Sequence, residues 1–205
     1  MTVELLYFAN PMCSWCWGFA PVIAHLAERL PVTLAMGALG RGDAPMRPED
    51  KTAIREHWDH VHTLTGQPFD YGFFAREDFV YDTEPACRAV TVVRRQRPEL
   101  ALRYLASLQR AFYAEGCDIT RPAELQRVAA GLGVDPQHFA ADLAAAQVRA
   151  AMIEEFGQTA GLGVTGYPTL LALDAGRARV LSLGCRPLAE IEAAIAQLLE
   201  PSIPA

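Results

Sequence analysis

The residues with the clearest chemical potential are two cysteines three positions apart, in the segment Cys13-Ser14-Trp15-Cys16. Residues at this spacing are neighbours on a helix, and two such thiols can close a disulfide bond. Residues 3–9 predict a strand and residues 13–30 a helix, so Cys13 falls at a helix N-terminus, over unpaired N–H groups and the positive end of the helix dipole. Because this position stabilises a thiolate, we expect Cys13 to be the attacking thiol. Cys16, one turn deeper and shielded, is expected to be the resolving thiol.

Two other interpretations of the cysteine pair are open. A C-x-x-C segment can supply half of a zinc site, or both cysteines can be inert core residues. The remaining cysteines, Cys87, Cys117 and Cys185, stand singly, so the sequence holds no second C-x-x-C segment. The strand-to-helix context favours redox chemistry, and no metal site is predicted at the pair.

Composition and charge exclude several classes of function. The 205 residues are 51% hydrophobic and 20% charged, which suits one large domain or one domain with an insertion. The net charge of −6 argues against a protein that binds nucleic acid or anionic membranes, because such proteins usually have a basic surface. Lys51 is the sole lysine and does not follow a glycine, so the sequence contains no glycine-lysine phosphate loop. Residues 1–9 lack the features of a secretory leader. We therefore expect a cytoplasmic protein with no nucleic-acid and no membrane partner, and its oligomeric state is open.

The elements that must position the cysteines follow in three blocks. Residues 3–9, 13–30 and 32–39 predict a strand, a helix that contains Pro21, and a second strand parallel to the first. After a loop at 41–48, the next block is predicted to be helical, with helices at residues 49–64, 84–96, 98–114, 122–130 and 136–160. The last block predicts strands at 167–173 and 178–183 around a hairpin turn at 174–177, then an amphipathic helix at 188–199.

Three further patterns receive structural interpretations. Residues 161–166 match G-x-G-x-x-G, but they follow a predicted helix and precede a predicted strand, the reverse of a nucleotide-binding loop. His57, His60 and His62 could include a metal site, although a solvated helix face is favoured. Residues 69–81 hold six aromatic side chains, and we expect an apolar seam between the helical block and the sheet, with a substrate-contacting lid as the alternative.

The order of elements, the early C-x-x-C segment and the late Tyr167-Pro168 step together resemble the DsbA-like family of thioredoxin-fold proteins, over the whole chain. The resemblance implies an α/β, thioredoxin-like fold with a large all-helical insertion. It further implies a discontinuous thioredoxin-like domain of residues 1–40 and 160–205, and an insertion domain of residues 41–159.

The same resemblance implies which residues bind the substrate. In thioredoxin-like folds a cis proline at the position of Pro168 lies opposite the cysteines and exposes the backbone of the preceding residue to a substrate chain. Substrate binding is therefore expected at Tyr167 and Pro168, and at Ser14 and Trp15 between the cysteines. Tyr7 stands where thioredoxin and DsbA keep a buried acid.

The segment at residues 10–18, NPMCSWCWG, is most similar to a cytoplasmic branch of predicted protein-disulfide isomerases, related to FrnE and to 2-hydroxychromene-2-carboxylate isomerases. The resemblance implies a thiol-disulfide oxidoreductase in which Cys13 and Cys16 act through a mixed disulfide. Its partners would be protein or small-molecule thiols and disulfides. No bound cofactor is expected beyond redox exchange with glutathione or a partner thiol, and the direction of electron flow is open.

Two other functions are possible. A glutathione-dependent isomerase or transferase is the first, although the related isomerases carry serine where this chain has Cys13. A non-enzymatic, redox-switched adaptor or holdase that uses the aromatic segment is the second. Cys185, which follows the last predicted strand, could reach the active site, although an inert thiol is favoured, and Cys87 is expected in the core.

Overall fold

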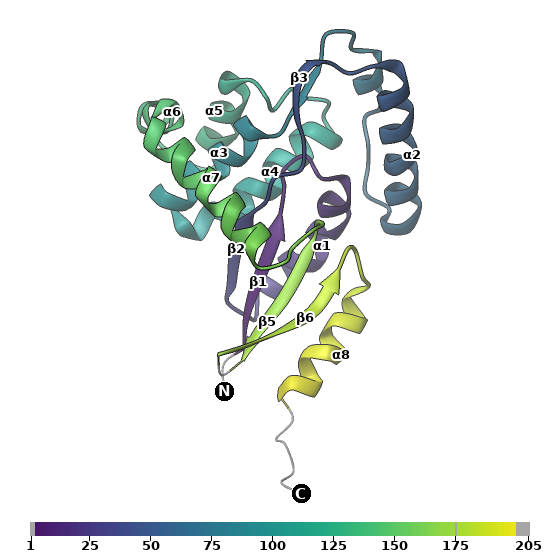
Figure 1. Ribbon diagram of the computed structural model, residues 1–205, viewed down its shortest axis with the longest axis vertical. Coiled ribbons are helices and arrows are strands. Elements are labelled where there is room, and N and C mark those ends of the chain that lie inside the picture. The colour runs from purple at the N-terminus through teal and green to yellow at the C-terminus, as the bar shows by residue number, and fades with distance from the viewer. Residues whose placement is uncertain (1–2, 175, 200–205) are drawn as a thin grey trace, which may run out of the picture.

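A computed structural model describes residues 3–174 and 176–199 of the chain (Figure 1). A four-stranded sheet has the order β2-β1-β5-β6, in which β1 and β2 run parallel and the other neighbours antiparallel. Its strands come from both ends of the chain, as predicted: β1 (Glu4–Ala9), β2 (Val32–Met36), β5 (Thr169–Asp174) and β6 (Arg177–Leu183). The predicted hairpin turn at 174–177 includes Ala175, which lies outside the described residues.

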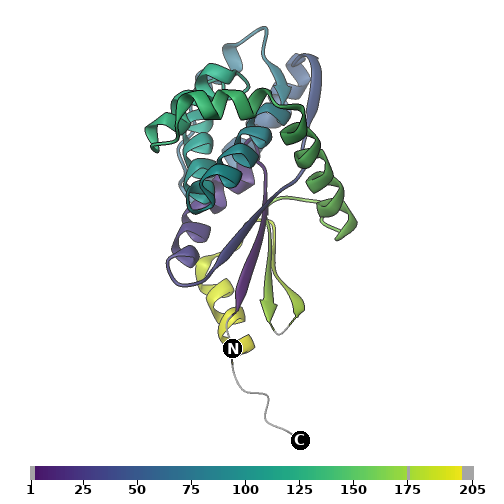
Figure 2. The same ribbon diagram turned by 90° about the vertical axis from the view of Figure 1, so that its left-hand side faces the viewer.

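Helices α1 (Ser14–Ala27) and α8 (Leu188–Leu199) both pack against this sheet. Helix α1 follows β1 and contains Pro21, as predicted, and it ends three residues earlier than expected because residues 28–30 form a turn before Pro31. Helix α8 closes the chain against β6, with Ile191 and Ile195 buried. Figure 2 shows the sheet and α8 at one end of the molecule and most of the other helices at the opposite end.

The residues between β2 and β5 are mostly helical, as predicted. They form two short 3-10 helices and six α-helices: η1 (Tyr71–Ala75), η2 (Pro98–Leu100), α2 (Pro48–Thr65), α3 (Glu84–Gln96), α4 (Ala101–Tyr113), α5 (Pro122–Gly131), α6 (Pro136–Ala144) and α7 (Ala146–Gly161). In Figure 1, α3 to α7 gather on one side of the molecule and α2 stands apart on the other. The division into domains at residues 40 and 160 stays a prediction.

The expectation of an all-helical insertion is wrong in one respect. Residues 41–48, predicted as a loop, include strand β3 (Arg41–Pro45), which pairs antiparallel with β4 (Val80–Asp82). The two strands are separated by α2 and η1, and each is too short to show an alternating pattern. This pairing depends on contacts distant in the sequence, which local composition does not report.

The single helix predicted at 136–160 is also wrong. Ala145 is extended, with φ −73° and ψ 127°, and it separates α6 from α7. The break lets Leu143 and Val148 both enter the core, although the two helices run in different directions. Alanine, glutamine and valine around the break carry no turn signal, so tertiary packing decides here over local helix propensity.

Side chains from the insertion cover the outer edge of β2. Glu155 of α7 accepts a hydrogen bond from the Met36 N–H at 3.0 Å, and Thr159 donates to the Met36 carbonyl at 3.0 Å. Arg94 of α3 donates to the Leu34 carbonyl at 2.5 Å and forms a two-pronged ion pair with Glu155 at 2.6 Å. The insertion therefore satisfies backbone groups that an uncovered edge strand leaves unpaired.

Candidate active site

Cys13 caps the N-terminus of α1. Its backbone is extended, with φ −94° and ψ 113°, and its sulfur accepts a hydrogen bond from the Cys16 N–H at 3.3 Å. The side chain is 4% exposed. The sulfur therefore lies at the free N–H groups and the positive end of the helix dipole. The position predicted for Cys13 is therefore the one observed.

The late Tyr167-Pro168 step lies beside this sulfur. The peptide bond between these two residues is cis, and the Cys13 thiol donates a hydrogen bond to the Tyr167 carbonyl at 3.4 Å. The fold thus brings together two segments that are 154 residues apart. A substrate sulfur bonded to Cys13 would emerge next to the backbone of Tyr167.

Cys16 lies one turn further along α1 and has no exposed surface. Burial raises the pKa of the Cys16 thiol well above its usual range, and the neighbouring Cys13 raises it further. The Asn10 backbone and the Tyr7 hydroxyl act in the opposite direction on this pKa. The shielding expected of Cys16 is therefore present.

Asn10, which the sequence indicated only as a turn residue, organises the loop before Cys13. Its side-chain amide is fully buried and donates to the Gly37 carbonyl at 2.8 Å and to Thr83 at 3.3 Å. Its side-chain oxygen accepts from the Met12 N–H at 2.9 Å, and its carbonyl accepts from the Cys13 N–H at 3.1 Å. One side chain therefore links the cysteine loop to the end of β2 and the start of α3.

Tyr81 of β4 supports the same loop from the insertion. Its hydroxyl donates a hydrogen bond to the carbonyl of Met12, the residue before Cys13. Burial raises the pKa of Tyr81, and Cys13 is the next cause. Tyr81 belongs to the aromatic segment at residues 69–81, but no local sequence pattern predicts its contact with residue 12.

The two residues between the cysteines lie on the first turn of α1 and are partly buried. The Trp15 ring contacts the His60 ring of α2, edge to face, with 5.3 Å between centroids. Helix α2 therefore flanks the active-site turn. His62 bonds the Gln67 carbonyl through Nδ1 at 2.8 Å, and His57 is exposed. Within the ranges 3–174 and 176–199, no group of three or more metal-ligating side chains occurs.

Tyr167 packs against a residue without a side chain. A Cβ atom at Gly37, just after β2, would collide with the Tyr167 ring and hydroxyl. Burial, followed by Cys87 and then by the active-site cysteines, raises the pKa of Tyr167. Gly37 thus leaves the space in which the Tyr167 ring lies.

The single cysteines differ in their surroundings. Cys87 is fully buried, as expected, and accepts from the Asn10 amide at 3.3 Å. Cys117 and Cys185 are half-buried. Cys185 lines a cavity of about 370 Å³ together with Gly18 and other residues of α1, α2 and the β6–α8 connection. Burial raises the pKa of Cys185, and Cys13 raises it further. The favoured interpretation of Cys185 as an inert thiol, with access to the active site as the alternative, stays a prediction.

The aromatic segment at 69–81 is an apolar seam, but not between the helices and the sheet. Four of its six rings lie against the buried Trp58 of α2, with Phe69 and Phe74 at 5.0 and 4.8 Å between centroids. Phe112 and Tyr113 of α4 complete the cluster. Tyr113 in turn stacks on Trp17 of α1. The segment joins α2 to α4 and, through Trp17, to the helix that carries the cysteines.

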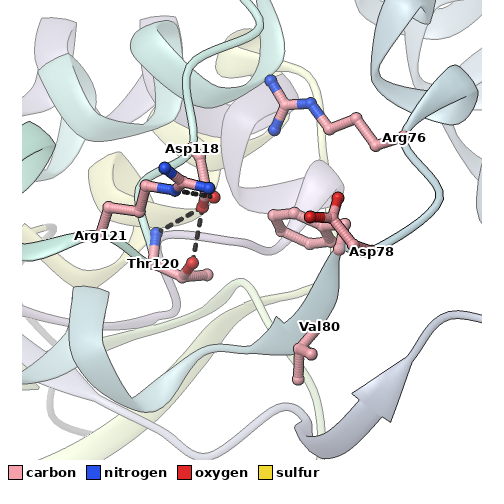
Figure 3. A pocket seen from close by; sticks show the side chains of 7 residues that line it. Arg76, Asp78, Val80, Asp118, Thr120 and Arg121 are labelled. Atoms are coloured by element: carbon pink, nitrogen blue, oxygen red, sulfur yellow. Dashed lines mark hydrogen bonds and ion pairs between the residues drawn. The ribbon is translucent and has the colours of Figure 1, made fainter.

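A larger cavity, of about 530 Å³, lies entirely within the insertion (Figure 3). Arg76 and Asp78 line one side, and Asp118, Thr120 and Arg121 line the other. Asp118 bonds both Thr120, at 2.6 Å, and Arg121, at 3.0 Å. Because no thiol lines it and its lining lies within the insertion, this cavity has no part in the chemistry of the cysteine pair.

Comparisons with known proteins agree with this geometry. A candidate protein disulfide isomerase from Nitrosomonas europaea, known from its crystal structure, is 34% identical, with a TM-score of 0.89 and coverage of 97% of this chain and 98% of that one. The cytosolic disulfide reductase DsbM from Pseudomonas aeruginosa, also solved with GSH, is 29% identical, with a TM-score of 0.78 and coverage of 95% and 98%. The ClpXP adapter protein SpxH from Bacillus subtilis (strain 168) is 23% identical over 171 residues, and the match spans 82% of this chain but only 57% of that protein.

No helix in the described ranges is both long and apolar enough to cross a membrane. The family model described as a DSBA-like thioredoxin domain matches residues 4–196, nearly the whole chain. The thioredoxin-like fold with a helical insertion is thereby confirmed. The chain belongs to the DsbA-like thioredoxin-domain family of thiol-disulfide oxidoreductases.

Proposed function

We propose that the protein exchanges thiols and disulfides through Cys13 and Cys16, with Cys13 as the nucleophile. The observation that supports this most directly is the position of the Cys13 sulfur, 3.3 Å from the Cys16 N–H and 3.4 Å from the Tyr167 carbonyl. The helix N-terminus presents N–H groups and the positive end of its dipole to the attacking sulfur, and the Tyr167 backbone offers a surface along which a substrate chain can lie.

The exchange has two steps. The Cys13 thiolate attacks one sulfur of a substrate disulfide; the substrate S–S bond breaks, the other substrate sulfur leaves with the electron pair, and a mixed disulfide forms. Cys16 then loses its proton and attacks the Cys13 sulfur. The second substrate sulfur leaves as a thiolate and takes up a proton, so the substrate is reduced by two electrons and Cys13–Cys16 is oxidised. The reverse order oxidises a substrate dithiol.

The partners we propose are protein and small-molecule thiols and disulfides, with glutathione or a partner thiol restoring the reduced pair. The structure of DsbM with GSH, a relative at 29% identity, supports glutathione as one such thiol. That relative is named as cytosolic, which supports a cytoplasmic location for this chain. The alternative of a glutathione-dependent isomerase or transferase is less favoured, because Cys13 stands where the related 2-hydroxychromene-2-carboxylate isomerases carry serine.

Replacing each cysteine in turn tests the proposal. Cys13→Ser is expected to abolish insulin reduction, because no nucleophile remains, while Cys16→Ser is expected to accumulate a mixed disulfide, because the resolving thiol is lost. Trapped species are measured by mass spectrometry after acid quenching. Cys117→Ser, the same change at a half-buried thiol of the insertion, is the control and should leave turnover unchanged. Normal turnover in both active-site variants would contradict the assignment.

A second candidate is the adaptor function, which the similarity to SpxH favours. An adaptor holds a partner protein without chemistry at the cysteines. It therefore predicts that the Cys13→Ser/Cys16→Ser double variant still binds its partner tightly, as measured by affinity capture with non-reducing elution. Capture that depends on Cys13 and is reversed by dithiothreitol would support the oxidoreductase instead.

A further inference from the structure

The Tyr7 side chain is a buried polar group that the two-step exchange does not yet use. It lies in the middle of β1 with no exposed surface. The Tyr7 hydroxyl is buried, and it has no hydrogen-bond partner among the described residues. Burying a hydroxyl without a hydrogen bond is unfavourable, and a fold retains such a group most readily where it acts in another state of the protein.

The surroundings of Tyr7 show which group it faces. Leu5, Tyr7 and Ala9 share one face of β1, because side chains alternate along a strand. This face packs against α1: the Tyr7 ring lies 5.9 Å from the Phe19 ring, and Cys16 lies one turn before Phe19 on the same buried side of the helix. Among the neighbouring groups, Cys16 is the one that raises the pKa of the Tyr7 phenol most, after the effect of burial.

Cys16 needs a hydrogen-bond donor when it becomes a thiolate. Two influences disfavour its charge, burial and the neighbouring Cys13, and only the Asn10 backbone and the Tyr7 hydroxyl favour it. The other phenols near the pair are placed differently. Tyr81 already donates to the Met12 carbonyl. The Tyr113 hydroxyl is also buried without a partner, but its ring packs on Trp17 and Trp58, and Tyr81 raises its pKa before either cysteine does.

We propose that Tyr7 is a positioning residue for the resolving step: its hydroxyl donates a hydrogen bond to the Cys16 thiolate as that thiolate attacks the mixed disulfide. The inference rests on the function proposed above. In the balanced step, the Cys16 thiol loses its proton, its sulfur bonds to the Cys13 sulfur, and the Cys13–substrate bond breaks. The substrate sulfur leaves with the electron pair and binds a proton. The phenol keeps its own proton throughout.

The experiment separates the two steps with an aromatic disulfide, Ellman's reagent. Attack by Cys13 releases one coloured thiolate, and resolution by Cys16 releases the second, so stopped-flow absorbance gives both rates. The half-buried thiols Cys117 and Cys185 are replaced by serine in every protein, so that they do not contribute colour. The variant is Tyr7→Phe, which keeps the ring beside Phe19 and removes only the hydroxyl.

In Tyr7→Phe the first phase is expected to keep its rate, while the second slows roughly tenfold near neutral pH, as expected for losing a hydrogen bond to a charged group. The pH profile of the second phase moves upward by about one unit, which corresponds to the same tenfold change. The other ionisable groups facing the pair, Tyr81, Tyr113 and Tyr167, are unchanged in the variant. The control is Tyr104→Phe, which also deletes one buried hydroxyl, here bonded to the Leu125 carbonyl within the insertion.

Each outcome has one meaning. A second phase that keeps its rate and pH profile in Tyr7→Phe overturns the inference, and equal slowing in Tyr104→Phe does so as well, because the effect would then be general destabilisation. Absence of the first phase in the unmodified protein overturns the proposed function itself. If Tyr7→Phe does not fold, 2,3-difluorotyrosine at position 7, a more acidic donor, is the second variant. The inference then requires a faster second phase at neutral pH, and an unchanged rate overturns it.

Discussion

At the scale of single residues, the position of Tyr167 depends on a residue that has no side chain. Gly37→Ala would place a Cβ atom where the Tyr167 ring and hydroxyl now lie, so the ring must move and the backbone beside Cys13 must shift with it. We expect at least about a tenfold rise in KM for a peptide disulfide, with a smaller change in kcat, because substrate placement is lost before chemistry.

The matched control for Gly37→Ala is Gly157→Ala. A Cβ atom at Gly157 meets nothing within 4 Å, and the residue lies inside α7. Since alanine favours a helix over glycine, this change should stabilise the protein by about 0.5–1 kcal/mol and leave both kinetic constants alone. Steady-state assays and urea unfolding measure the two effects, and equal KM values for the two variants would contradict the role of Gly37.

Residues with a local sequence signal were predictable at this scale, and residues that act across the fold were not. The spacing of Cys13 and Cys16 and the strand before them place both thiols on the first turn of a helix. Asn10 and Tyr81 hold the same loop through bonds to Gly37 and Met12, over separations of 27 and 69 residues. No pattern along the chain reports such contacts, since they exist only once β2 and β4 are in place.

At the scale of elements, the insertion stabilises the sheet by bonding the backbone groups at the outer edge of β2. Glu155→Ala removes the acceptor of the Met36 N–H and leaves the guanidinium of Arg94 without its two-pronged partner. We expect a loss of about 2 kcal/mol in the free energy of unfolding, measured by urea titration, because a largely buried charged hydrogen bond is broken. Glu99→Ala, which breaks an exposed pair with Arg97, is the control and should leave the free energy of unfolding nearly unchanged. Equal losses of unfolding free energy in the two variants would contradict the prediction, because the edge contacts would then stabilise the protein no more than an exposed ion pair.

The same element shows where helix prediction succeeds and fails. Helix α3 was predicted at its observed bounds, because its apolar residues recur at helical intervals between a proline and a following break. The separation of α6 from α7 at Ala145 was missed, because alanine-rich sequence favours continuing a helix, and the break is decided by what each helix packs against.

At the scale of the whole molecule, two fully buried thiols make the stability of the reduced protein depend on alkaline pH. Burial raises the pKa of Cys16 and of Cys87 well above the ordinary value of 9.0. Above about pH 9 the unfolded chain therefore loses protons that the folded chain keeps, and linkage lowers the free energy of unfolding as pH rises, by up to about 3 kcal/mol per pH unit for two thiols. Below that pH both states hold these protons, and the two thiols add no pH dependence.

Urea titrations from about pH 7 to about pH 10, with a reductant present, measure this slope. The control is the same protein with Cys13 and Cys16 joined in a disulfide, in which Cys16 no longer titrates, so the slope should become smaller while Cys87 still contributes. A free energy of unfolding that stays constant to about pH 10 in the reduced protein would contradict the burial of these thiols.

The distance along the chain between Cys13 and Tyr167 also governs when the protein can first act. A ribosome adds about 5–20 residues per second, so the 154 residues between the sulfur and its carbonyl partner take about 8 to 30 seconds to synthesise. During that interval the two cysteines exist without β5, without the Tyr167 backbone and without α8. A nascent chain therefore contains both thiols long before the active site is complete. Until the last fifth of the protein is made, the oxidation state of the two cysteines depends on the redox conditions of the surrounding compartment.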